Sequence, residues 1–186
     1  MNIIKRINTI AKPASLKRIA GFALLVILSE LLFVLLITPT IKASSGAGLL
    51  DSLAFAELSV YKAYFEAYTA ETRFVHYLST SLDMIFPLFY GGLIYLLILR
   101  FGKRESVSNA GLWLVLLTVI FDYAENLGIV FSLSHYKKAG VVLVRYLQVS
   151  SSAKSILLSA SIIVCMIIIF DYLLIVNKRK KGGTNH

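Results

Sequence analysis

Four long runs of apolar residues, separated by charged stretches, constrain this chain more than any other feature of its sequence. A helix needs about 20 mostly apolar residues to cross a bilayer, and the runs at residues 20–38, 84–100, 111–133 and 155–176 approach or meet that length. Pro39 follows the first run and is expected to end it. The pattern predicts an all-α fold, a four-helix transmembrane bundle forming one domain over residues 1–186.

Composition supports the same conclusion. Of the 186 residues, 58% are hydrophobic and 16% are charged, against about 45–50% and about 25% in soluble domains. The net charge of +9 is concentrated beside the apolar runs, which suits contact with anionic lipid headgroups. No nucleic-acid module is present, so the expected partners are membrane lipids, not nucleic acid. The single cysteine, Cys165, excludes a CxxC metal or redox site and is expected to be a small buried side chain.

The distribution of Lys and Arg predicts the orientation of the helices. Four crossings put both termini on one side, and that side collects twelve of the 19 basic residues, against seven on the other. The bias predicts a multi-pass protein of a bacterial inner membrane with cytoplasmic N- and C-termini. The basic start and the first run also resemble a signal peptide, but the run is too long and contains Glu30 near its middle, which favours an uncleaved helix.

Three further segments suggest helices outside the apolar runs. Residues 49–82 carry aromatic and aliphatic side chains at steps of three and four, which predicts an amphipathic helical segment across the extracytoplasmic mouth of the bundle. Residues 2–12 predict either a short interfacial helix or a basic tail. Residues 141–149 predict either a second external helix or the first turns of a long fourth helix.

Acidic residues inside the third run are the most informative for function, because a carboxylate in a bilayer usually faces a bundle interior or a cavity. Asp122, Glu125 and Asn126 are spaced i, i+3, i+4, which places them on one helical face. Glu30 lies near the middle of the first run. We predict no basic residue at mid-span, which leaves three solutions: carboxyls that share a proton, a bound cation, or an external base such as Arg145 or His76 reaching inward.

Residues at the start of the second run could complete such a site. Asp83 precedes Pro87, and it is either a helix cap or the outer rim of the acidic pocket. Tyr90 could donate a hydrogen bond to the acids or simply pack in the core. His76 has no partner at ligand spacing, so no metal site is expected. The Ser150–Ser152 stretch with Lys154 superficially resembles a Ser–Lys pair, but that composition is ordinary for the loop we expect there.

Two stretches carry a family resemblance: Leu-Asp-Met-Ile-Phe-Pro-Leu-Phe-Tyr-Gly at 82–91 and Asp-Tyr-Ala-Glu-Asn-Leu at 122–127. They resemble small bacterial four-helix membrane proteins with LDxxFPxxYG and DxxEN segments, over about the middle quarter of the chain. The resemblance assigns no reaction and no cofactor. It implies that the residues of the two segments act together, namely Asp83, Pro87, Tyr90, Gly91, Asp122, Glu125 and Asn126.

Three functions follow as hypotheses. The first is a small polytopic protein whose intramembrane acidic pocket binds a cation, a proton or a polar lipid headgroup. Its binding residues would be Glu30, Asp83, Tyr90, Asp122, Glu125, Asn126 and Arg145. The second is a membrane-embedded enzyme that modifies a lipid, with Asp122 or Glu125 as catalytic general acid or base. The third is a non-catalytic assembly subunit, in which the acids meet a membrane protein partner or a second copy of the chain.

Overall fold

The computed structural model describes residues 14–45, 57–67, 69–135 and 140–182. Within these ranges every regular element is helical, so the all-α prediction is confirmed. The predicted interfacial helix at residues 2–12 lies outside the described residues. The helices are α2 (Leu16–Leu32), η1 (Phe33–Ile37), α3 (Thr38–Ser45), α4 (Leu58–Glu66), α5 (Ala70–Asp83), α6 (Phe86–Phe101), α7 (Glu105–Ser134) and α8 (Val141–Gly182).

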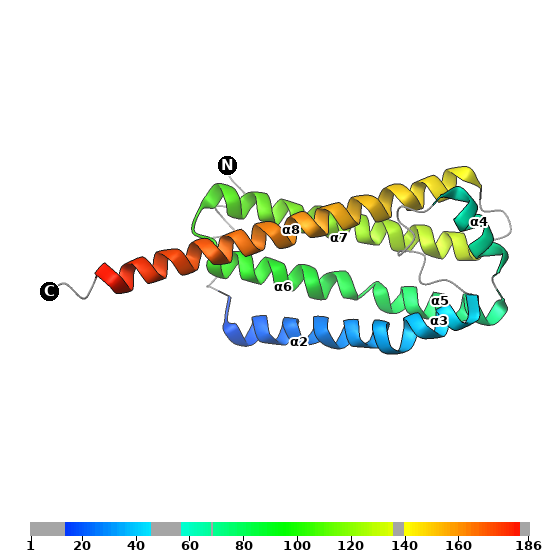
Figure 1. Ribbon diagram of the computed structural model, residues 1–186, viewed down its shortest axis with the longest axis horizontal. Coiled ribbons are helices and arrows are strands. Elements are labelled where there is room, and N and C mark those ends of the chain that lie inside the picture. The colour runs from blue at the N-terminus through cyan, green and yellow to red at the C-terminus, as the bar shows by residue number, and fades with distance from the viewer. Residues whose placement is uncertain (1–13, 46–56, 68, 136–139, 183–186) are drawn as a thin grey trace.

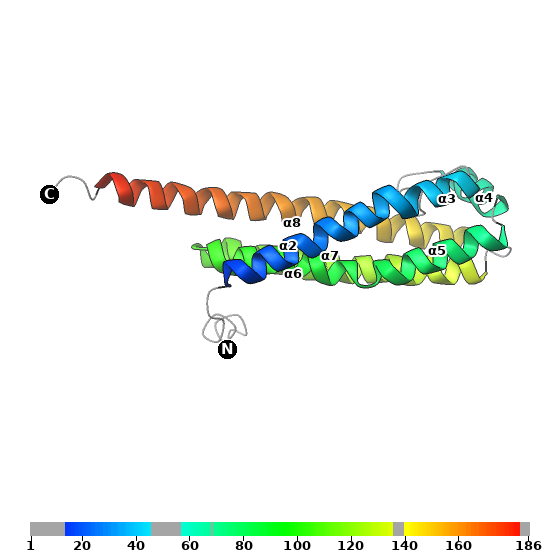
Figure 2. The same ribbon diagram turned by 90° about the horizontal axis from the view of Figure 1, so that it is seen from below.

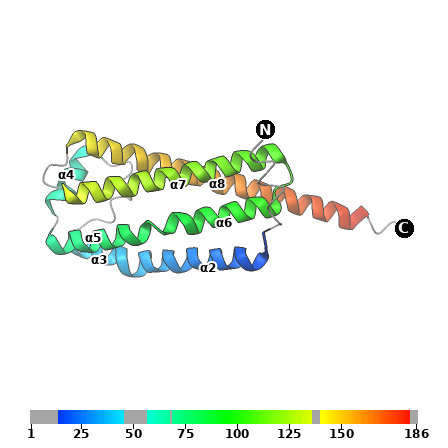
Figure 3. The same ribbon diagram turned by 180° about the vertical axis from the view of Figure 1, so that it is seen from behind.

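Four helical spans in the described part of the chain are long and apolar enough to cross a membrane, and they contain the four predicted runs. The spans are Leu16–Ala43, Ala70–Phe101, Glu105–Ser134 and Val141–Lys178. They lie lengthwise, with the start of α2, the end of α6 and the start of α7 at one end (Figure 1). Helix α8 projects beyond the others at that end, and α3, α4 and α5 lie at the opposite end (Figures 1 and 3). We call these the terminal end and the distal end of the bundle.

The first span does not stop at Pro39, contrary to the prediction. Proline has no amide hydrogen and its ring crowds the carbonyl four residues back, so it normally ends or kinks a helix. Here the wider π-helical turn η1 precedes it, and the Thr38 amide donates to the Phe33 carbonyl, five residues back. The Thr40 hydroxyl donates to the Leu36 carbonyl at 2.7 Å. The helix therefore continues past the proline as α3.

The second span is interrupted rather than continuous. Helix α5 ends at Asp83, a turn covers Met84 and Ile85, and α6 starts at Phe86 with Pro87 in its first turn. Helix α5 runs in line with α6 instead of across the bundle mouth, as Figure 1 shows, and α4 lies at the distal end. Of the predicted amphipathic segment, residues 49–56 and 68 lie outside the described residues; the described part is largely helical, as α4 and α5, and α5 extends a span.

The core lies where α6, α7 and α8 pack together. Its buried members are Tyr90, Ile94, Ile98, Val115, Cys165 and Ile168. Cys165 is buried, as predicted. Helix α2 packs on α6 and runs obliquely past it (Figure 2), and its start is fixed by Arg100, which donates to the Ala14 carbonyl at 2.7 Å. At the distal end a second group of buried side chains includes Ile41, Tyr61 and Tyr64.

Candidate functional site

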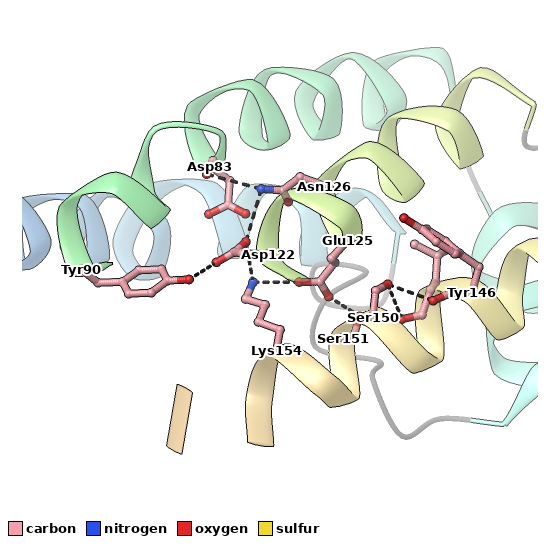
Figure 4. Close-up of polar contacts among 10 residues, drawn as sticks. Asp83, Tyr90, Asp122, Glu125, Asn126, Tyr146, Ser150, Ser151 and Lys154 are labelled. Carbon is pink, nitrogen blue, oxygen red and sulfur yellow. Dashed lines mark hydrogen bonds and ion pairs between the residues drawn. The ribbon is translucent and has the colours of Figure 1, made fainter. Parts of the chain in front are cut away.

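The polar face of α7 is enclosed by the bundle. Asp122, Glu125 and Asn126 are 0%, 1% and 1% exposed, as their i, i+3, i+4 spacing predicts. Asp122 points from α7 toward α6 and α8, Glu125 toward α8, and Asn126 toward Asp83 at the end of α5 (Figure 4). Since charged side chains are almost never fully buried without a partner, the contacts of the two carboxylates decide what this face can do.

Lys154 of α8 provides the compensating charge. Its Nζ atom lies 2.8 Å from Glu125 Oε2 and 3.2 Å from Asp122 Oδ1, so one ammonium bridges both acids (Figure 4). The Lys154 side chain is 16% exposed. Hydrogen-bonded ion pairs of this length are among the stronger polar contacts in proteins. Asp122, Glu125 and Lys154 are called the ion triad below.

This lysine corrects the prediction that no basic residue lies at mid-span. The alternative for residues 141–149 is settled in favour of a long last helix, because α8 begins at Val141. Lys154 is therefore nearly four turns inside a helix rather than in a loop. Its signal was available in the sequence, since Val144, Leu147, Ser151 and Lys154 recur at steps of three and four, which marks one helical face.

The two bases proposed from the sequence do not take this place. Arg145 is exposed near the start of α8, and its guanidinium donates to Gln148 Oε1 at 3.3 Å. The prediction that Arg145 lies among the acids is wrong. Arg145 is about 13 Å from Lys154 along the axis of α8, toward the start of that helix. His76 is buried in α5 and makes an edge contact with Tyr64, with 6.4 Å between ring centroids.

Further donors complete the shell of the ion triad. Tyr90 Oη donates to Asp122 Oδ2 at 2.6 Å, and Tyr90 also belongs to the buried core, so both alternatives predicted for this residue hold. Ser151 Oγ donates to Glu125 Oε1. Each carboxylate therefore receives a hydroxyl hydrogen bond in addition to the lysine (Figure 4). Such a network is stable in a low dielectric when its members are satisfied.

Asn126 links α7 to the interruption between α5 and α6. Pro87 has no amide hydrogen, so it cannot donate to the carbonyl of Asp83, four residues back. The Asn126 amide nitrogen donates to that carbonyl and to Asp122 Oδ1, both at 3.4 Å. These two acceptors fix the orientation of the amide. Asn126 Oδ1 is buried and has no hydrogen-bond partner among the described residues.

The two segments that carry the resemblance are thus in direct contact. The Asp83 carbonyl meets Asn126 and the Tyr90 hydroxyl meets Asp122. Gly91 lets α6 approach α7 closely, since a Cβ atom there would lie 2.8 Å from Val119 Cγ2.

A cavity of about 350 Å³ lies beside the ion triad. Its wall combines ionisable, hydroxyl and apolar side chains from the first span, α5, α6, α7 and α8. The lining residues are Glu30, Phe33, Val34, Thr38, His76, Ser79, Thr80, Asp83, Phe86, Asn126, Ile129, Lys154 and Leu158. Of the predicted site residues, Glu30, Asp83 and Asn126 border this cavity. Asp122 and Glu125 stand behind Lys154 instead, and we call this space the polar cavity.

Within the described ranges, no group of three or more His, Cys, Asp or Glu side chains is arranged to hold a metal ion. Comparisons of the chain with protein-family models, curated proteins and solved structures give no match. The geometry of the polar cavity and the ion triad therefore carries the functional argument.

Proposed function

We propose that this chain is a multi-pass membrane protein whose polar cavity binds the headgroup of a membrane lipid. The observation that carries the proposal is the mixed wall of that cavity. Glu30, Asp83 and Lys154 line it together with Phe33 and Leu158. A lipid has a polar headgroup and hydrocarbon chains. The charged side chains of the wall can contact the headgroup, and the apolar side chains can contact the hydrocarbon.

The size of the cavity favours a headgroup over a bare ion. Sites for small organic ligands occupy roughly 300–1,000 Å³, and the polar cavity, at about 350 Å³, falls in this range. The carboxylates of Asp122 and Glu125 contact Lys154 and hydroxyl donors and are not members of the cavity wall. This arrangement supports a role for them in holding Lys154, and it argues against their use as general acid or base on a ligand.

The cavity also reaches the outer surface of the bundle. Val34 lines it and is 60% exposed, in a span long and apolar enough to lie in a membrane. A lipid could thus enter sideways along η1. The excess of basic residues beside the termini supports the finer proposal of a bacterial inner membrane protein with cytoplasmic termini. In that orientation the cavity, bordered by α3 and α5, belongs to the extracytoplasmic half.

Lipid retention tests the proposal. The full chain is reconstituted in vesicles of equal parts phosphatidylethanolamine and phosphatidylglycerol, extracted into detergent, and examined by native mass spectrometry. Val34→Trp places an indole at the mouth of the cavity, while Leu35→Trp, at a neighbouring residue that is 64% exposed and does not line it, is the matched control. We expect the Val34 variant to retain less lipid than the control. Equal retention by the two variants would contradict the proposal.

A further inference from the structure

Acidic groups outnumber basic ones in the wall of the polar cavity and directly behind it taken together. Glu30 and Asp83 line it from α2 and α5, and Asp122 and Glu125 lie directly behind Lys154. Against these four carboxyls stand two basic side chains in the wall, Lys154 and His76. Because the Lys154 ammonium already contacts Asp122 and Glu125, which lie outside the wall, Glu30 and Asp83 are the acidic groups that a ligand in the cavity would meet. A site with more acidic than basic groups around it favours a ligand of positive charge.

The end of α5 strengthens the preference for a cation. Ser79, Thr80 and Asp83 all lie within its last five residues and line the cavity. The C-terminal end of a helix carries partial negative charge from its last carbonyl groups. The Thr80 hydroxyl donates its hydrogen to the His76 carbonyl at 2.9 Å, so its oxygen can serve a ligand as an acceptor.

Asn126 supplies an independent sign that a donor belongs near this wall. Its amide nitrogen is directed at the Asp83 carbonyl and at Asp122, so its oxygen is the group that lacks a partner among the residues described. A buried amide oxygen without a donor is destabilising by about 1–3 kcal/mol. Because less than 1 Å² of this oxygen is accessible, an N–H donor in the cavity that Asn126 lines would reach it only after a small shift of the amide.

We infer that the headgroup bound in the polar cavity carries a primary ammonium, as in an aminophospholipid, and this rests on the proposed function. A primary ammonium has three N–H donors, which can each donate to one of the acceptors on Glu30, Asp83 and Thr80. A quaternary amine has methyl groups in their place and cannot donate to these acceptors. The hydrocarbon part of the ligand lies along Phe33, Val34 and Leu158.

Headgroup competition tests the inference. The full chain is incubated in detergent with phosphatidylethanolamine, phosphatidylcholine or phosphatidylglycerol of identical acyl chains, and bound lipid is counted by native mass spectrometry. We expect phosphatidylethanolamine to bind about fivefold or more tightly than either competitor, because phosphatidylglycerol lacks the cation of the ion pair and phosphatidylcholine lacks the N–H donors, and either loss is worth about 1 kcal/mol. Glu30→Gln and Asp83→Asn should each reduce this preference, while Glu71→Gln, on α5 but outside the cavity wall, should not.

The outcomes separate this inference from the proposed function. Equal binding of the three lipids, or a preference for phosphatidylglycerol, overturns the inference that the headgroup carries a primary ammonium. In that case, loss of lipid from the Val34→Trp variant would still support the proposed lipid site. Stabilisation by ethylamine or sodium chloride alone, as large as that by phosphatidylethanolamine, overturns the assignment to a lipid. If Glu30→Gln and Asp83→Asn both keep the full preference, the ammonium is recognised elsewhere and the inference fails.

Discussion

Lys154 is the residue whose removal should disturb the structure most, because two buried carboxylates share its charge. With Nζ–oxygen distances of 2.8 and 3.2 Å, Coulomb's law at an effective dielectric constant of about 20 gives roughly 6 and 5 kcal/mol of attraction. Desolvation of the three groups offsets most of this. Removing one partner of a buried pair nevertheless destabilises proteins by about 3–5 kcal/mol, because the remaining charge stays buried.

We therefore expect Lys154→Met to lower the free energy of unfolding by about 3–5 kcal/mol, measured by denaturant titration in mixed micelles. Lys178→Met, at an exposed position of the same helix, is the matched control and should change stability by less than about 0.5 kcal/mol.

A triple variant tests the electrostatic reasoning itself. Adding Asp122→Asn and Glu125→Gln to Lys154→Met removes the uncompensated charges and keeps hydrogen-bonding groups at both sites. Replacing a whole buried ion pair is often neutral, so the triple variant should regain most of the lost stability. If Lys154→Met is as stable as the parent chain, or the triple variant is no more stable than the single one, the ion triad does not carry the charge balance described.

Three smaller changes examine the contacts around the triad by the same unfolding measurement. Tyr90→Phe deletes the 2.6 Å hydrogen bond to Asp122 and should lower stability by about 1.5–3 kcal/mol, the range for hydrogen bonds to charged groups; no change would mean the hydroxyl is dispensable. Asn126→Leu should be destabilising by about 1–3 kcal/mol. The effect should be smaller in a Pro87→Ala background, because the amide of Ala at position 87 can donate to the Asp83 carbonyl that Asn126 no longer contacts. An equal effect in both backgrounds would rule out the contact between Asn126 and this carbonyl as the cause. Gly91→Leu should be destabilising by about 1–3 kcal/mol through overpacking between α6 and α7, and a neutral result would show that the helices can separate there.

The membrane-spanning elements could be predicted because their cause is local. Long apolar runs need no tertiary information to be recognised, and the four spans contain all of them. The shared helical face of Asp122, Glu125 and Asn126 could also be predicted, since helical periodicity alone sets it. Helix ends were less predictable: the local pattern left two alternatives open for residues 141–149, where α8 starts at Val141, and it gave no sign of the π-turn before Pro39.

The site shows the same division. The burial of acids in the third span could be predicted from the sequence, because their spacing sets their helical face and the apolar run around them sets their depth. What neutralises them depends on how distant parts of the chain pack: Lys154 lies in α8, 29 residues further along the chain than Glu125. Which charge meets which depends on how α7 and α8 are rotated and shifted against each other. That fit is set by side-chain packing along the whole interface, and no short stretch of sequence encodes it.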